Sequence, residues 1–140
     1  ATQSLAANRI SHVFDLRGPS LVVDTACSSS LVATHLAAQS IWSGDADAAL
    51  IGGVNLILKP EPHIGFSKAG MLSPDGRCKS FDDSANGYTR SEGAACLLLK
   101  PLDKAIQDKD RVYAVMRGTA INQDGRDTAN NSISVPNQEA

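Results

Sequence analysis

The sequence contains little cysteine and histidine, and this scarcity excludes several kinds of site. Its three cysteines are an odd number and lie far apart, so neither a disulfide framework nor a cysteine-rich metal site is expected. No Cys-x-x-Cys, His-x-x-x-His or aspartate-rich calcium loop occurs, and we interpret the adjacent Asp82 and Asp83 as a solvated turn. Phosphate-binding glycine loops and the Gly-x-Ser-x-Gly elbow of serine hydrolases are also absent. We therefore expect no metal and no cofactor bound through such a loop.

The sequence also lacks an excess of charge of either sign and any long apolar run. Its 13 basic and 15 acidic residues are scattered, so no basic stripe indicates a nucleic-acid partner. Its apolar stretches are interrupted by glycine or polar residues, and a membrane-spanning helix needs about 20 apolar residues in succession. A cytoplasmic protein with reduced thiols and no membrane partner is expected. Because the chain starts at Ala1 without methionine and stops within a polar run, we also expect it to be a piece of a larger protein.

Helix-forming and strand-forming segments follow one another along the chain. The expected helices are 1–14, 28–42 and 60–69, and 102–107 is expected to be a short helix or a turn. The expected strands lie within 20–23, 46–58, 94–99 and 112–121. Segment 28–42 is apolar around most of its circumference, which predicts a helix buried on several sides. Gly52 and Gly53 predict a bulge or the close approach of another backbone. The polar segment 73–93 is long for a loop, and Phe81, Tyr88 and Arg90 favour an ordered, functional one.

Cys27 is the strongest candidate for a chemically reactive residue. It lies between an apolar strand and a helix, where unpaired N–H groups and the helix dipole favour a thiolate. The local pattern leaves open the alternative of a buried structural cysteine. His35 would lie about 12 Å further along the same helix, beyond hydrogen-bond reach, and we interpret it as structural. Because nothing local brings His12 or His63 to Cys27 either, a cysteine hydrolase is disfavoured.

Six motifs follow one another in order along the sequence. The first leads from Gly18-Pro19 into Val23-Asp24-Thr25-Ala26-Cys27-Ser28-Ser29-Ser30-Leu31. The others are Gly52-Gly53-Val54-Asn55, Gly65-Phe66-Ser67, the run from Leu72 to Lys79 with Phe81-Asp82, Gly87-Tyr88 with Arg90 and Glu92-Gly93, and Arg117-Gly118-Thr119-Ala120 with Asn122-Gln123-Asp124-Gly125. With these motifs the sequence resembles the β-ketoacyl synthases, in particular the ketosynthase domains of type I polyketide synthases.

The resemblance implies an α/β fold, the thiolase-like fold with its layered α-β-α-β-α arrangement, incomplete in this chain. Residues 1–102 would be the end of the N-terminal half, which holds the nucleophile, and residues 103–140 the start of the C-terminal half. Cys27 would be the catalytic nucleophile, and its backbone N–H a candidate oxyanion donor. Cys78 and Cys96 match no catalytic position; we expect a loop thiol and a buried strand residue, respectively. Relatives with glutamine in place of the nucleophile are excluded by Cys27.

The activity implied is that of an acyltransferase of the 3-oxoacyl-[acyl-carrier-protein] synthase type. It joins an acyl-cysteine to a malonyl-type unit by decarboxylative Claisen condensation, in polyketide or fatty acid biosynthesis. The implied partners are an acyl carrier protein, whose phosphopantetheine arm holds the substrates, neighbouring acyltransferase domains and a second copy in a homodimer. The family's two histidine motifs and its lysine do not occur here, so this piece alone is expected to be inactive. The alternative is a non-elongating domain that only accepts and transfers acyl chains or acts as a scaffold.

Overall fold

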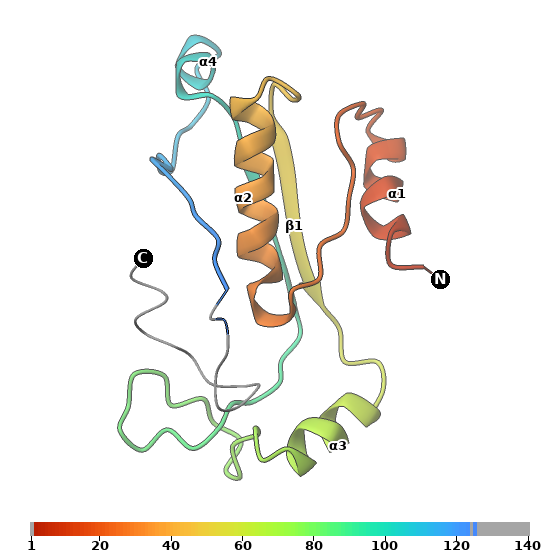
Figure 1. Cartoon of the computed structure of the whole chain (residues 1–140), viewed down its shortest axis with the longest axis vertical. Helices are drawn as coiled ribbons and strands as arrows, with labels where there is room; N and C mark the ends of the chain where they lie inside the picture. Colours follow the sequence, from red (N-terminus) through yellow and green to blue (C-terminus); the bar gives the residue numbers. More distant parts are fainter. Residues whose placement is uncertain (1, 124, 126–140) are drawn as a thin grey trace. The chain divides into compact units, whose positions relative to one another are not determined.

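The computed structural model describes residues 2–123 and 125. In chain order its elements are α1 (Leu5–Val13), the 3-10 helix η1 (Ala26–Ser28), α2 (Ser29–Trp42), β1 (Ala49–Asn55), α3 (Glu61–Lys68), β2 (Gly93–Leu99) and α4 (Leu102–Gln107) (Figure 1). Strands β1 and β2 pair in a two-stranded sheet. The chain divides into two compact units: residues 52–96 form one, and the flanking described residues form the other.

Helix α2 is the longest element of the first unit and confirms the helix predicted over 28–42. No glycine or proline interrupts it, and its end is set by Gly44, which adopts a φ of 84°. The N–H of Gly44 donates to the carbonyl of Ile41, and that of Asp45 to the carbonyl of Ser40. This pair of bonds is a Schellman motif, which glycine favours because it enters the left-handed region without steric cost.

The core of the first unit is small. Its buried apolar residues are Ala38 of α2, Ile51 of β1 and Ala105 of α4. The prediction that α2 is buried on several sides is wrong for the described chain, because only His35 and Ala38 are buried along it and Leu31 is 75% exposed. The pattern of apolar residues shows which faces of a helix can be buried. Whether they are buried depends on other elements packing against those faces.

Two of the four predicted strands form and two do not. Strand β1 lies within its predicted segment and β2 begins one residue before its own, but the described structure has no strand at 20–23 or at 112–121. A strand exists only when another pairs with it, and within the described residues neither segment is paired. The predicted close approach of another backbone is not found at Gly52, where a Cβ would meet nothing within 4 Å of the described residues. Cys96 of β2, which we expected to be buried, is exposed.

A lysine clamp follows β2 and fixes the turn after α4, which has the predicted bounds 102–107. The ammonium of Lys100 binds the carboxylates of Asp108 and Asp110, the latter at 2.6 Å. The hydrogen bonds that Lys100 donates to Asp108 and Asp110 raise its pKa, and the same contact lowers the pKa of Asp108. The clamp holds the end of this short helix.

The second unit contains α3 and a long ordered loop. Helix α3 falls within the segment predicted over 60–69, and the proline preference for a first helical turn explains its start. After the loop the chain returns beside β1: the Asn55 side chain donates to the Ser91 carbonyl at 2.5 Å, and the Ile57 N–H donates to the Glu92 carboxylate at 2.6 Å. Among the described residues no helix is long and apolar enough to cross a membrane.

Candidate active site

The segment that leads to Cys27 is extended but does not belong to a sheet. It is tied to α1 by a hydrogen bond of 2.8 Å from the Ser11 hydroxyl to the Ser20 hydroxyl. Leu21 and Val22 are 55% and 43% exposed. In place of the predicted buried strand, the chain here is an exposed extended segment. It then turns into α2 (Figure 1).

The turn itself presents Cys27 at the surface of the unit. Cys27 is the central residue of η1, two positions before α2 begins, and its thiol is free and exposed. The residue before it, Ala26, has a φ of 57°. A residue with a Cβ enters this left-handed region at a cost of about 1–2 kcal/mol, so the turn holds Ala26 in an unfavourable conformation. Such strain occurs at functional turns.

Side-chain hydrogen bonds stabilise this strained turn on both sides. The Asp24 carboxylate accepts the N–H of Ala26 at 3.1 Å. The Ser29 hydroxyl accepts the N–H of Thr25 at 2.9 Å and donates to the carbonyl of Ala26 at 2.7 Å. Ser28 also turns back, and its hydroxyl lies 2.9 Å from the Thr25 carbonyl and 2.8 Å from the Thr25 hydroxyl.

These bonds leave the start of α2 without a side-chain cap. Ser28 occupies the N-cap position, yet its side chain makes no capping bond to the helix. Asp24, Thr25 and Ser28 are of residue types common at N-cap positions, and all three instead form or flank the turn. The N-terminus of α2, which carries a partial positive charge, thus follows Cys27 closely in the chain, and no side-chain oxygen among the described residues caps it.

The histidines of the first unit do not serve Cys27. His35 is buried on α2, as the structural interpretation requires, and its Nδ1 has no hydrogen-bond partner among the described residues. His12 lies in the last turn of α1 and is exposed. Neither forms a hydrogen bond with Cys27 in the described structure. His63 lies on α3 in the other unit, so a local cysteine–histidine pair receives no support.

The other two cysteines differ from Cys27 in their surroundings. Cys78 lies in the long loop, as predicted, and its sulfur accepts the N–H of Thr89 at 3.1 Å. Cys96 lies on β2 and is exposed, whereas we predicted a buried strand residue. Neither adjoins the start of a helix. Of the three thiols, Cys27 alone occupies such a position.

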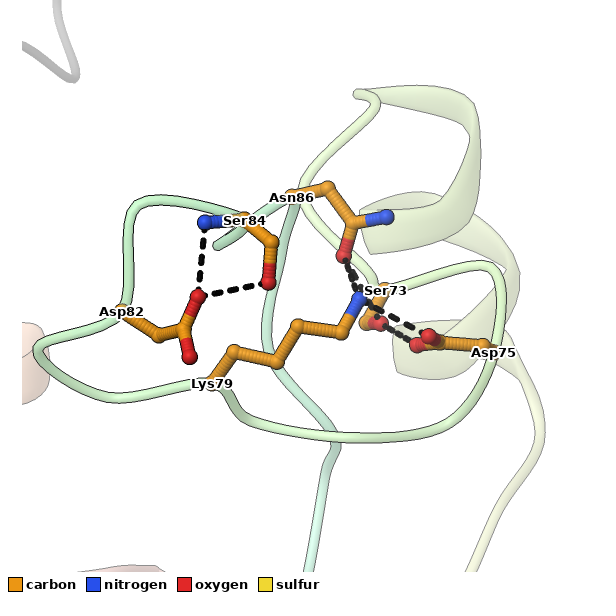
Figure 2. Close-up of polar contacts among 6 residues, drawn as sticks. All are labelled: Ser73, Asp75, Lys79, Asp82, Ser84 and Asn86. Carbon is orange, nitrogen blue, oxygen red and sulfur yellow. Dashed lines mark hydrogen bonds and ion pairs between the residues drawn. The ribbon is translucent and has the colours of Figure 1, made fainter.

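The long loop is ordered by a network of polar side chains, which Figure 2 shows. The Lys79 ammonium lies 2.8 Å from the Asp75 carboxylate and 2.7 Å from the Asn86 side-chain oxygen. The hydroxyl of Ser73, which is buried, lies within hydrogen-bond distance of both the Asp75 carboxylate and the Asn86 side-chain oxygen. The hydrogen bond from Lys79, followed by that from Ser73, lowers the pKa of Asp75 to about 2. One cation thus joins the two ends of the loop.

Close backbone contact and an aromatic cluster complete the loop. The N–H of Ser73 donates to the Tyr88 carbonyl at 2.9 Å, and Gly87 has a φ of 134°. A Cβ at Gly87 would lie 2.5 Å from the backbone of Leu72, so only glycine fits there. The guanidinium of Arg90 lies 4.9 Å from the centre of the Phe66 ring, which in turn meets the Tyr88 ring edge-on. The prediction of an ordered loop is confirmed, and Tyr88 and Arg90 contribute to that order.

Comparison with known proteins shows the family of this chain. The sequence model described as "Beta-ketoacyl synthase, N-terminal domain" matches residues 1–105. This match covers well over half of the chain. The chain therefore belongs to the β-ketoacyl synthase family.

Within that family the chain is similar to polyketide synthases from bacteria and fungi. It is 55% identical over 137 residues to a phenolphthiocerol/phthiocerol polyketide synthase of Mycobacterium tuberculosis, covering 98% of this chain and 6% of that protein. It is 57% identical over 136 residues to a highly reducing polyketide synthase of Aspergillus calidoustus, covering 97% of this chain and 5% of that protein. The chain thus spans only about a twentieth of the length of these relatives.

A solved structure supports the fold. The ketosynthase from module 6 of the bacillaene synthase of Bacillus subtilis 168 is 47% identical, with a TM-score of 0.95, over 98% of this chain and 25% of that one. At this identity and TM-score the chain has part of the α/β, thiolase-like fold of the ketosynthases. The predicted fold class and family are confirmed.

Sequence reasoning located Cys27 but missed the bonds that shape its turn. The signal was present: Asp, Ser and Thr readily hydrogen-bond nearby backbone groups, and four such residues surround Ala26 and Cys27. The same residue types are also the usual N-caps of helices, so the pattern alone does not distinguish a cap from a turn. Only the folded structure reveals which backbone groups the side chains reach.

Proposed function

We propose that Cys27 is the acyl-accepting nucleophile of a ketosynthase that forms carbon–carbon bonds. The observation that supports it is the position of its thiol, which is exposed on a strained turn immediately before a 14-residue helix. A thiolate is the reactive form of cysteine, and the positive end of a helix stabilises it. The family to which the chain belongs makes acyl transfer the natural use of such a thiol.

The first step is a thioester exchange. The Cys27 sulfur attacks the carbonyl carbon of an acyl chain held on a phosphopantetheine thiol, and the carrier thiol leaves as the new thioester forms. Negative charge develops on the carbonyl oxygen in between, and the backbone N–H of Cys27 is a candidate donor to it. The product, an acyl-cysteine, keeps the acyl group activated for attack by carbon.

The second step is a decarboxylative Claisen condensation. A malonyl-type unit on an acyl carrier protein loses carbon dioxide, and its α-carbon attacks the acyl-cysteine carbonyl. The carbon–carbon bond forms as the bond to the Cys27 sulfur breaks, which regenerates the thiolate. The histidines and lysine that ketosynthases use in this step match no motif of this chain, so the rest of the protein would supply them.

The proposal extends to the partners and the setting of the chain. We propose an acyl carrier protein, neighbouring acyltransferase domains of the same synthase and a second copy in a homodimer as partners, with no resident cofactor. Residues 1–102 and 103–140 would contribute to the two halves of the ketosynthase domain. The free state of all three cysteines supports a reducing compartment, the cytoplasm.

The test is the order in which the three cysteines react in the intact parent synthase. Iodoacetamide or a cerulenin-like epoxide is expected to modify Cys27 well before Cys78 or Cys96, as followed by peptide mass spectrometry. An acyl-N-acetylcysteamine thioester should acylate the peptide containing Cys27, and Cys27→Ala should abolish this adduct while Cys96→Ala should not. Equal modification of all three cysteines, or acylation that survives Cys27→Ala, would contradict the proposal.

The same synthase also tests the alternative of a non-elongating domain. Supplied with a malonyl-loaded carrier protein, a condensing enzyme releases carbon dioxide and forms a product longer by two carbons. Acylation of Cys27 without that product would favour the transfer or scaffold function and would exclude condensation.

A further inference from the structure

The hydroxyl of Ser29 forms hydrogen bonds with two backbone groups of the turn that precedes Cys27. It accepts a hydrogen bond from the N–H of Thr25 and donates one to the carbonyl of Ala26. The donor and the acceptor flank the left-handed residue Ala26. A hydroxyl has one proton to donate and lone pairs to accept, so a single serine satisfies both groups at once.

This double contact stabilises a conformation that the backbone does not favour by itself. Alanine at a φ of 57° tends to relax into the right-handed regions. Relaxation would rotate the peptide between Ala26 and Cys27 and thereby swing the Cys27 sulfur. The Asp24 carboxylate accepts a further hydrogen bond of 3.1 Å from the N–H of Ala26.

We propose that Ser29 is a positioning residue for Cys27: it directs the sulfur towards the acyl carbonyl by holding the left-handed turn. This rests on the proposed function of Cys27 as the nucleophile. Within the described structure the Ser29 hydroxyl bonds to the backbone of residues 25 and 26 and not to the Cys27 sulfur, so it acts through that backbone. Asp24 has the same role through the third backbone group.

If Ser29 positions Cys27, its loss should affect reactions that need a defined orientation of the sulfur more than reactions that do not. Acylation by a bound thioester requires the sulfur and the carbonyl carbon in near-attack geometry, and a displacement of about 1 Å can cost roughly 100-fold in rate. Alkylation by iodoacetamide, a small reagent with no binding site, depends chiefly on the thiolate and its exposure. Loss of the Ser29 hydroxyl should therefore slow acylation much more than alkylation.

The experiment uses the intact parent synthase and compares Ser29→Ala with the wild type. We expect acylation of Cys27 by an acyl-N-acetylcysteamine thioester to slow by about 10- to 100-fold. The iodoacetamide rate should change by less than about 3-fold, with an unchanged pH profile, since exposure and local charge are preserved. Ser29→Thr, which keeps the hydroxyl, should restore most of the acylation rate.

Ser30→Ala is the matched control. It removes a hydroxyl from the next residue, and within the described structure the Ser30 hydroxyl makes no hydrogen bond, so its acylation rate should stay near that of the wild type. If Ser29→Ala does not fold, Asp24→Ala compared with Asp24→Asn tests the same turn, and only the alanine variant should slow acylation.

Two results would overturn the positioning role: acylation at the wild-type rate in a folded Ser29→Ala, or a loss of the same size in Ser30→Ala. A parallel loss of acylation and alkylation would also contradict it, because it would indicate altered reactivity of the thiol. Failure of the proposed function is distinct, since Cys27 would then not be acylated in the wild type at all.

Discussion

At the scale of single residues, the turn around Cys27 depends on the size of the side chain at position 26. Ala26 has a φ of 57°, and its small Cβ is the least that a chiral residue can bring into this region. The neighbouring polar side chains, Asp24 and Ser29, are short enough to reach the backbone of the turn. Position 26 therefore limits which residues can precede the nucleophile.

Replacement of Ala26 tests this limit. In the parent synthase Ala26→Val should lower the unfolding free energy by about 1–3 kcal/mol and slow the acylation of Cys27, because a β-branched residue is strongly disfavoured there. Ala26→Gly should stay within about 1 kcal/mol of the wild type, since relief of strain opposes the added chain entropy. Urea unfolding and acylation rates check both. A valine variant as stable as the glycine variant would show that the turn is not strained.

At the scale of elements, the loop between α3 and β2 depends on one lysine. Lys79 joins Asp75 near its beginning to Asn86 near its end (Figure 2). The loop contains no helix or strand, so its order rests on these contacts, on the backbone pairing of Ser73 with Tyr88 and on Gly87. A loop of this length without regular structure needs such bonds.

The pKa of Asp75 gives this loop a defined acid sensitivity. The pKa is lowered from 3.8 to about 2 in the folded state, so the stabilisation by ionised Asp75 is fully present above pH 3.8 and is lost as the pH falls through about 2. In the parent synthase Asp75→Asn should reduce the protection of the loop amides at neutral pH. The difference from the wild type should shrink between pH 4 and pH 2 as Asp75 becomes neutral.

Hydrogen exchange read by mass spectrometry measures this difference. Asp83→Asn serves as the control, because in the described structure the Asp83 side chain makes no hydrogen bond or ion pair. A difference between wild type and Asp75→Asn that grows as the pH falls would contradict the assigned sign.

At the scale of the whole molecule, the described residues bury few apolar side chains. Ala38, Ile51 and Ala105 are the buried apolar residues, while Leu58, Leu98 and Leu31 are 81%, 68% and 75% exposed. The chain corresponds to a quarter of the length of the bacillaene ketosynthase structure. A core this small cannot offset the entropy of ordering the chain.

Expressed alone, the 140-residue chain should therefore lack a cooperative unfolding transition and should bind the dye ANS. The complete ketosynthase domain of the same synthase, which would cover these side chains, should unfold cooperatively and bind little dye. Calorimetry and dye fluorescence compare the two. A sharp calorimetric transition in the short chain, without dye binding, would contradict this expectation.

The sequence by itself determined the family, the position of Cys27 immediately before a helix, and the helices α2 and α4. These features are local: an uninterrupted helix-forming run stopped by Gly44 has few alternatives. Tertiary structure decided which apolar segments became strands. Segments 20–23 and 112–121 have strand-like patterns but no partner among the described residues, while β1 and β2 have each other.

Tertiary structure also decided how the cysteine is presented. Asp24, Ser28 and Ser29 could cap the helix or bind the turn, and sequence alone does not distinguish the two because both use the same short oxygen-bearing side chains. In the folded chain they bind the turn and hold Ala26 in the left-handed region. The residue type at position 27 thus follows from the sequence, whereas the direction of its sulfur depends on hydrogen bonds that only the folded chain can form.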